Sequence, residues 1–178
     1  MWTLQEIFVF TVIFIVALIS VIVLVKMKKI RICQAVSFLV LLIYLAVVFA
    51  STVFTRNPGA REYQLELFWS WKEIIGIEPL GRLGSCSSAK ELLVENLLNM
   101  ILLFPGGILM PFVMDRKLQW WKGLLIGVLI SLMIEILQLV LCRGLFEFDD
   151  IIHNSIGYIV GCGCGGCVFS FFQNQHKK

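Results

Sequence analysis

The sequence predicts an all-α protein, a polytopic bundle of membrane-spanning helices. Of its 178 residues 59% are apolar and 15% are charged, and the mean hydropathy is +0.91. Soluble domains are about half apolar and about a quarter charged. The apolar residues gather in five runs, each close to the roughly 20 residues that a helix needs to cross the hydrocarbon core. We therefore expect five transmembrane helices and no separate soluble domain.

The five apolar runs cover residues 7–25, 35–54, 96–114, 123–141 and 151–172. The first run differs from a signal peptide, because Glu6 precedes it while Lys26 and Lys28 follow it. A signal peptide carries its positive charge before the apolar stretch. We therefore expect the first run to be a retained transmembrane helix.

Basic residues predict how the helices are oriented. They gather in every second loop and in the tail: Lys26, Lys28, Lys29 and Arg31; then Arg116, Lys117 and Lys122; then Lys177 and Lys178. Short loops rich in Lys and Arg stay on the cytoplasmic side of a membrane. The N-terminus is therefore expected outside and the C-terminus in the cytoplasm.

Charge and cysteine content limit the partners and cofactors. A net charge of +3, scattered along the chain, does not indicate nucleic-acid binding, so membrane lipids are the expected partners. Cys162, Cys164 and Cys167 invite a metal interpretation, but two residues on a helix differ by about 200° in direction, so these thiols do not converge. No metal or other cofactor is expected. A disulfide between Cys86 and Cys142, both in predicted outer loops, stays open.

Several polar residues interrupt the last three apolar runs. Glu135 lies six residues from the outer end of its run, or about 9 Å deep, where an ionisable group is costly and faces an interior partner. Antiparallel neighbours bring other polar residues to the same depth. The set, called the polar layer below, is Asn96, Asn99, Glu135, Gln138, Arg143, Asp149, Asp150 and Asn154. We predict that it forms a functional site near the outer surface; the alternative is a structural network of helix caps and interhelical hydrogen bonds.

Other residues predict how the helices pack. Pro105, followed by Gly107, predicts a kink in the third run, since proline removes a helical hydrogen bond. Gly157, Gly161 and Gly165 recur every four residues and predict a close helix contact.

An aromatic segment around Trp69 and Trp71 precedes the third run. It predicts a short interfacial helix that either holds the loop at the headgroup level or contacts a lipid-like ligand.

The polar motifs resemble the VanZ-like family, named for a teicoplanin-resistance protein of Gram-positive bacteria. The stretch from Asn99 to Pro105-Gly-Gly107 is similar to one family segment. A second segment matches at Ser131, Glu135, Gln138, Arg143, Asp149, Asp150, Asn154 and Gly157. The chain departs from the family pattern at Leu103-Phe104, where the aromatic residue comes one place late, and at Glu147, where aspartate is common.

The resemblance implies a domain division and a location. Residues 1–34 would form an N-terminal transmembrane helix with a basic cytoplasmic loop. Residues 35–178 would form the VanZ-like four-helix membrane domain, with an extracytoplasmic loop at 55–94. The family implies a bacterial plasma-membrane protein, in some members linked to glycopeptide resistance, and it supplies no mechanism.

Three functions compete for the polar layer. The first is binding or modulation of a lipid-linked cell-wall precursor or a lipoglycopeptide at the outer leaflet, with Arg143 on an anionic headgroup and Asn99 and Asn154 orienting it. The second is an intramembrane enzyme that uses Glu135 and Asp150 as general acid and base. A transporter ranks last, because the chain has few spans and no internal repeat. Since no nucleophile or metal motif is present, binding is preferred.

Overall fold

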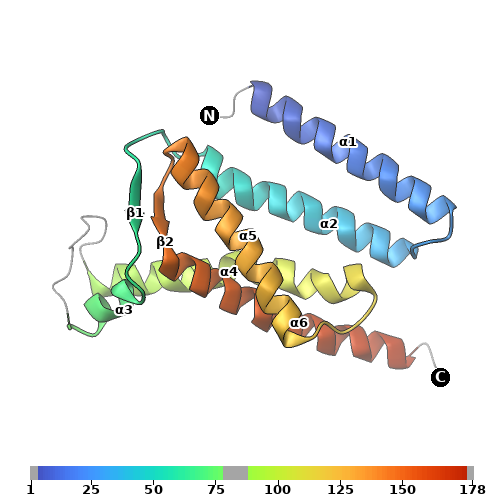
Figure 1. The fold of residues 1–178 in the computed structure, drawn as a ribbon. Coiled ribbons are helices and arrows are strands. Elements are labelled where there is room, and N and C mark those ends of the chain that lie inside the picture. The colour runs from blue at the N-terminus through green and yellow to red at the C-terminus, as the bar shows by residue number, and fades with distance from the viewer. Residues whose placement is uncertain (1–3, 78–87, 176–178) are drawn as a thin grey trace.

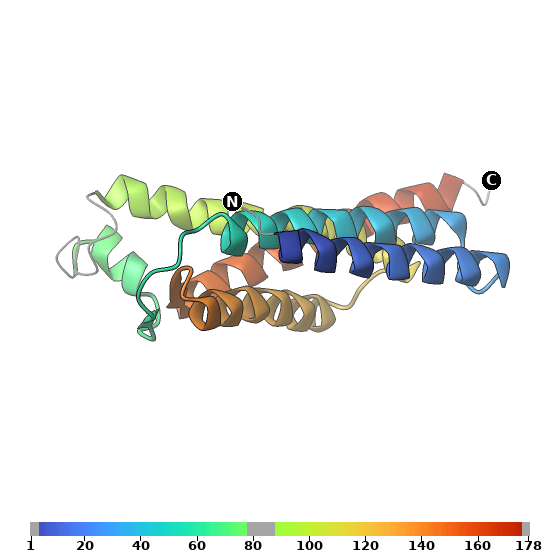
Figure 2. The same ribbon diagram turned by 90° about the horizontal axis from the view of Figure 1, so that it is seen from above.

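A computed structural model describes residues 4–77 and 88–175, and it is an elongated, mostly helical bundle (Figures 1 and 2). Its elements in chain order are α1 (Leu4–Lys26), α2 (Ile32–Phe49), the π-helix η1 (Ala50–Phe54), β1 (Glu62–Gln64), α3 (Trp69–Ile74), α4 (Ala89–Met114), α5 (Trp120–Leu141), β2 (Leu145–Glu147) and α6 (Phe148–Gln175).

Each of the five predicted apolar runs is helical. By length and composition four helices can cross a membrane: Ile32–Phe54, Ala89–Met114, Trp120–Leu141 and Phe148–Gln175. The first run contributes the shorter apolar stretch Thr11–Lys26, within a helix that lies at the edge of the bundle beside α2 (Figure 1). A bundle with four membrane-crossing helices is therefore supported, and a fifth crossing stays a prediction.

The contact between α4 and α6 forms the centre of the bundle. Gly157 lies against the backbone of Met100, Gly161 against Phe104, and Gly165 against Ile108. In each pair the residue numbers differ by the same amount, so the two helices run parallel and start at the same end. A β-carbon at any of these glycines would overlap backbone atoms of α4. Small residues permit this close approach in an apolar solvent, where helices associate by packing.

The helices α2 and α5 flank this pair. Gly127 of α5 lies against Tyr158 of α6, while Leu103 and Ile134 join Tyr158 in the buried core. Gly107 lies against the backbone around Gly161, which leaves no room for a side chain.

Pro105 does not interrupt α4, which continues through it to Met114. One turn before it, the Leu102 carbonyl accepts a hydrogen bond from the Tyr44 hydroxyl of α2. Carbonyls near an internal proline often find a partner on a neighbouring helix.

The fold is mostly helical, as predicted, and it adds two short strands that the sequence does not predict. β1 and β2 pair in parallel, with Tyr63 opposite Phe146, and Gly59 donates a backbone hydrogen bond to Cys142 (2.6 Å) just before the pairing begins. Three-residue segments show no useful periodicity in the sequence, and this pairing joins residues about 80 positions apart. The strands tie the segment after η1 to the connection between α5 and α6.

The segment predicted as an extracytoplasmic loop, 55–94, contains the first turns of α4. α4 begins at Ala89, where the Ser88 hydroxyl accepts from the backbone N–H of Glu91 (3.3 Å). Serine is a favoured N-cap, so helix formation starts before the apolar run does. The polar first turns of α4, with Lys90, Glu91 and Glu95, therefore continue the apolar helix beyond its predicted start.

Candidate functional site

The polar layer lies at the end of the bundle where α2 and α5 finish and α4 and α6 begin (Figure 1). Five of its eight members are buried: Asn96, Glu135, Gln138, Asp149 and Asn154. Asn99, Arg143 and Asp150 are partly exposed. The structure therefore brings all eight to one end, as the topology predicts, and their individual contacts divide them into smaller groups.

Asp149 holds the aromatic segment onto the bundle. Its carboxylate accepts hydrogen bonds from the backbone N–H of Phe68 (2.6 Å), from the N–H of Ser70 (3.3 Å) and from the Ser70 hydroxyl (2.8 Å). These donors belong to the start of α3, so Asp149 caps a helix distant in sequence rather than its own. The Ser70 hydroxyl in turn accepts from Asn96 (3.1 Å). Asp149 and Asn96 are thereby occupied in placing α3.

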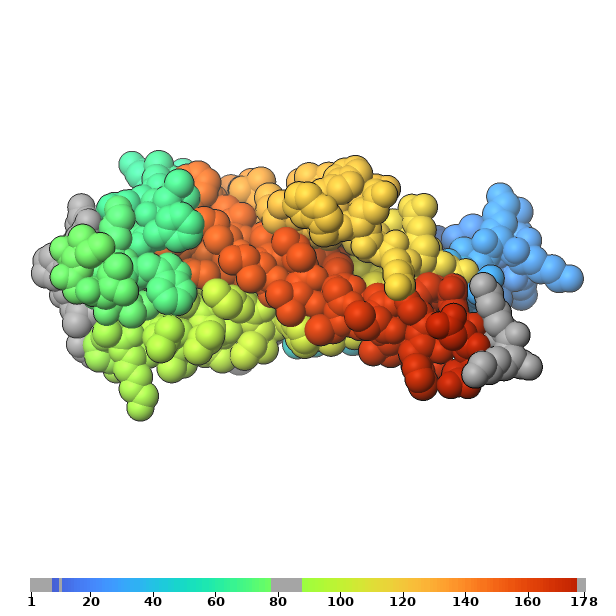
Figure 3. All heavy atoms as spheres, turned by 90° about the horizontal axis from the view of Figure 1, so that it is seen from below, coloured from blue at the N-terminus to red at the C-terminus, as the bar shows by residue number. Residues whose placement is uncertain are grey.

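The two tryptophans of α3 form hydrogen bonds with side chains next to the polar layer. Trp69 is buried, and its indole N–H donates to the Glu147 carboxylate (3.1 Å). The Trp71 indole N–H donates to Nε2 of the buried His153 (2.8 Å). Figure 3 shows the segment around α3 lying against the first turns of α4 and α6 at one end of the molecule. Both indoles donate hydrogen bonds to protein side chains, and Phe68 beside them is exposed. A position of this segment at the headgroup level stays a prediction, with Phe68 as its exposed side chain.

Glu135 and Glu147 are linked through the backbone. The buried Glu135 carboxylate accepts from the N–H of Glu147 at 3.0 Å. Glu147 lies in β2, outside the membrane-crossing helices, and the pKa of its carboxyl is raised to about 8. Burial is the largest cause, the negative charges of Asp150 and Glu95 add to it, and the Trp69 hydrogen bond opposes it. A protonated Glu147 near neutral pH follows from a site that collects carboxylates out of water.

The start of α6 carries two side-chain pairs across to its neighbours. Asn99 of α4 donates to the Asp150 carboxylate (2.5 Å), and Asn154 donates to the Ser131 hydroxyl of α5 (2.9 Å). Asn154 is fully enclosed, which suits helix bridging, whereas Asn99 and Asp150 retain access to the surface.

Gln138 and Arg143 form hydrogen bonds with backbone carbonyls at the end of the second span. Gln138 donates to the carbonyl of Thr52 (3.1 Å), and Arg143 donates to the carbonyl of Phe54 (3.5 Å) while lying over its ring. Both carbonyls belong to η1, where the last carbonyls of a helix lack helical partners. These contacts assign Gln138 and Arg143 to the closure of a helix end.

Five carboxylates interact with one another at this end of the bundle, and two of them interact with an arginine that the sequence analysis did not single out. Glu135 and Asp150 both interact electrostatically with Arg56, and the other three acids are Glu95, Glu147 and Asp149. The Arg56 guanidinium also approaches Gly144, where a β-carbon would come within 2.8 Å of it. Arg56 lies two residues after the second apolar run ends, and this position beside a predicted helix end is the sequence feature that could have identified it.

Comparison with known protein families identifies the family to which this chain belongs. The family model described as VanZ/LLP1 matches residues 35–169, from the first turn of α2 almost to the end of α6. The chain belongs to the VanZ/LLP1 family. The matched segment contains the whole polar layer and leaves out α1. No curated protein and no solved structure matches the chain.

An open groove of about 640 Å³ adjoins the polar layer of this VanZ/LLP1 chain. It is lined by Arg56, Ser88, Lys90, Glu91, Val94, Glu95, Leu98 and Asn99. Glu95, one of the five interacting carboxylates, lines the groove directly, and Asn99 links the groove to Asp150. Of the residues predicted to bind a ligand, only Asn99 lines this groove directly.

Metal binding and disulfide formation were the remaining questions from the sequence. Across residues 4–77 and 88–175, no group of three or more His, Cys, Asp or Glu side chains is arranged to hold a metal ion. Cys86 lies outside the described residues, so the disulfide with Cys142 stays an untested alternative.

Proposed function

We propose that this VanZ/LLP1 protein resides in a bacterial plasma membrane and binds or modulates a lipid-linked envelope molecule, or a lipoglycopeptide, at the outer leaflet. The proposal includes five membrane crossings, with the N-terminus outside and the C-terminus in the cytoplasm. The alternation of basic loops supports this orientation. In that orientation the polar layer and its groove open toward the outer leaflet.

The groove beside the polar layer is the observation that carries the proposal. Arg56 and Lys90 at its wall can contact an anionic group, beside the carboxylates of Glu91 and Glu95, and Val94 and Leu98 present apolar surface. Val94 is 46% exposed and Leu98 is 59% exposed, on a helix that can cross a membrane. A ligand with an anionic headgroup and an apolar tail satisfies both parts of this surface. Lipid-linked precursors have this amphiphilic character.

Arg56 replaces Arg143 as the residue that we expect to contact the headgroup. Arg143 is engaged with the carbonyl and the ring of Phe54. Arg56 is exposed and lines the groove, and it interacts electrostatically with Glu135 and Asp150. An arginine can offer two parallel donors to a phosphate, which gives orientation as well as affinity.

Binding of a polyprenyl phosphate and of teicoplanin to the purified full chain tests the proposal. Arg56→Gln should weaken the binding of whichever of the two ligands the wild-type protein binds by about tenfold or more, because a charge-assisted hydrogen bond is lost. Arg61→Gln is the matched control, since Arg61 is exposed in the same loop and is not among the residues lining the groove. The proposal fails if wild-type protein binds neither ligand, or if both variants weaken binding equally.

Acid–base chemistry on the bound headgroup is the second candidate function. The observation that favours it is the different surroundings of two carboxylates: Glu135 is enclosed and accepts a backbone N–H, while Asp150 is partly exposed beside the groove-lining Asn99. Carboxyl groups in unlike environments can divide into an acid and a base.

An Asp150→Asn variant separates the two functions. The amide keeps the shape of the side chain and a hydrogen bond to Asn99 while removing the ionisable group. If the protein is an enzyme, release of headgroup from a lipid-linked substrate should cease while binding persists. If wild-type protein binds lipid but shows no turnover across lipid phosphates and diphosphates, the enzyme function is excluded and binding remains.

A further inference from the structure

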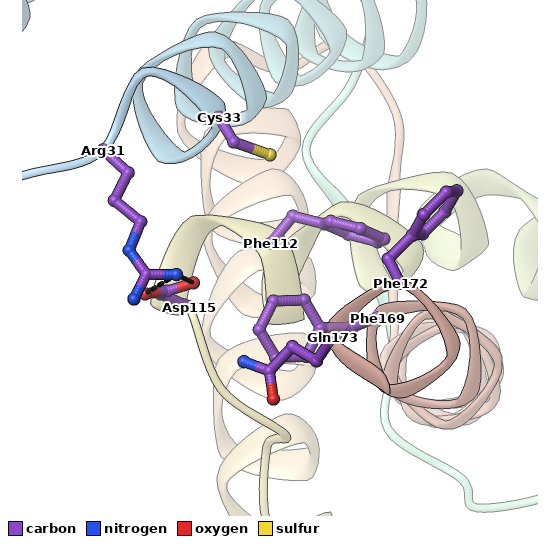
Figure 4. A pocket seen from close by; sticks show the side chains of 7 residues that line it. All are labelled: Arg31, Cys33, Phe112, Asp115, Phe169, Phe172 and Gln173. Atoms are coloured by element: carbon purple, nitrogen blue, oxygen red, sulfur yellow. Dashed lines mark hydrogen bonds and ion pairs between the residues drawn. The ribbon is translucent and has the colours of Figure 1, made fainter. Parts of the chain in front are cut away.

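The end of the bundle opposite the polar layer carries a second groove (Figure 4). It has a volume of about 630 Å³ and lies between α2, α4 and α6. The rings of Phe112, Phe169 and Phe172 form its apolar wall, and Arg31 and Asp115 meet at its edge. The rings of Phe112 and Phe169 pack edge to face with centroids 5.5 Å apart, which fixes the wall between α4 and α6.

A second opening of about 850 Å³ adjoins this groove and shares Arg31 and Asp115 with it. Lys28 and Lys29 line that opening. Between positions 26 and 31 and between 115 and 122 the chain has seven basic residues and one acidic residue, so this end of the bundle is strongly positive. An apolar wall with a cationic mouth complements an amphiphile with an anionic headgroup.

The ion pair at the mouth is easily exchanged for another anion. Arg31 lies 3.2 Å from Asp115, and the Arg31 side chain is 71% exposed. Ion pairs that exposed contribute little to stability, because water and salt compete for both charges. A phosphate offers several acceptor oxygens to the same guanidinium, so it can take over from the carboxylate or share Arg31 with it.

We propose that this groove binds one anionic phospholipid of the leaflet at this end of the bundle. One acyl chain lies against Phe112, Phe169 and Phe172, and the phosphate contacts Arg31, with Lys28 and Lys29 close by. The site is independent of the function proposed for the polar layer, which concerns the other end of the molecule.

Native mass spectrometry of the full chain in detergent tests the site. The protein is titrated with phosphatidylglycerol and separately with phosphatidylcholine of the same acyl chains, and the affinity of the first bound lipid is measured. Wild-type protein should prefer phosphatidylglycerol by about tenfold, and Arg31→Gln should reduce that preference about fivefold, since it removes the charge-assisted contact with the phosphate of the bound lipid.

Arg116→Gln is the matched control. Arg116 is an exposed arginine at the same end and is not among the residues that line either opening. It should keep the wild-type preference within about twofold. If both variants lose the preference equally, the attraction comes from the general charge of this end, and the site does not exist. Equal binding of the two lipids by wild-type protein also overturns the proposal.

Filling the groove provides a second test. Cys33 is exposed and lines the groove, so Cys33→Trp should place an indole where the acyl chain lies and weaken the first binding step of both lipids. If the spectra instead show a dimer that this variant dissociates, the groove accommodates a second copy of the chain and the proposal is wrong. Should Cys33→Trp not fold, the comparison of Arg31→Gln with Arg116→Gln decides alone, because both change exposed side chains.

Discussion

Asp149 is 1% exposed, and its burial is compensated by three hydrogen bonds from the start of α3. A carboxylate at the first turn of a helix also interacts favourably with the positive end of the helix dipole. These donors occupy both carboxylate oxygens of the buried side chain. The same contacts make Asp149 the residue that positions α3 over the polar layer.

Asp149→Ala should release α3 from the bundle. Three donors around Phe68 and Ser70 would lose their acceptor, and we expect the free energy of unfolding to fall by about 3 kcal/mol. Thermal unfolding in detergent measures the loss, and faster proteolysis between residues 55 and 77 would report the freed segment. Glu66→Ala, which removes the partly exposed ion pair with Lys72, should cost less than about 1 kcal/mol. Equal effects of the two variants would contradict the assigned role.

Glu147 makes stability depend on pH. Its carboxyl has a pKa of about 8 in the folded protein and about 4.5 when unfolded, so the folded state holds a proton that the unfolded chain has released. The stability that this proton provides is complete below about pH 4.5 and is lost as the pH rises through about 8.

The Glu147→Gln variant should therefore flatten the fall in melting temperature between about pH 5 and 8. The amide oxygen can still accept from the Trp69 indole, so the hydrogen bond is kept while the titration is removed. Glu62→Gln is the control, because Glu62 is an exposed carboxylate of the partner strand β1. An unchanged pH profile in Glu147→Gln would show that other groups cause the dependence.

At the scale of the elements, the α4–α6 pair depends on backbone contact. Gly161→Ala would place a methyl group onto the Phe104 carbonyl, which cannot move without separating the helices. We expect a loss of about 3 kcal/mol or failure to fold. Gly163→Ala on the same helix meets nothing within 4 Å and should be neutral or stabilising by up to about 1 kcal/mol, since alanine favours helix. Similar melting temperatures for the two variants would refute the packing.

The C-terminal end of the second span forms hydrogen bonds with two residues of the polar layer. η1 replaces the last α-helical turn with a wider one, and its carbonyls at Thr52 and Phe54 accept from Gln138 and Arg143. A helix end in an apolar solvent needs such partners, because no water reaches it. These two residues resemble ligand-binding residues in sequence, yet their contacts hold the second span against the connection that follows α5.

Across the whole molecule, the sequence predicts the helices, whose length and composition depend on the membrane solvent. It does not predict the positions of loop residues, which depend on tertiary contacts. The apolar runs identify the helices, because crossing a bilayer sets length and composition together. Alternating helix direction brings Asn99 and Asp150 to one end. Arg56, by contrast, lies in a loop, and contacts distant in sequence hold that loop near α5: the Gln138 and Arg143 hydrogen bonds to η1 and the pairing of β1 with β2. Such long-range pairings leave no periodic pattern in the sequence.

Cysteine labelling of intact cells tests the orientation and the fifth crossing together. In a variant whose native cysteines are replaced, a membrane-impermeant maleimide should label Asn57→Cys, at the end that carries the polar layer, and should label Lys29→Cys only after permeabilisation. Both positions are exposed, so access to the thiol depends on the membrane alone. Thr3→Cys decides the role of the first apolar run. If that run crosses the membrane, position 3 is labelled from outside like position 57; if it lies along the inner surface, position 3 behaves like position 29. Labelling at position 29 in intact cells, with none at 57, would invert the molecule and turn the polar layer toward the cytoplasm.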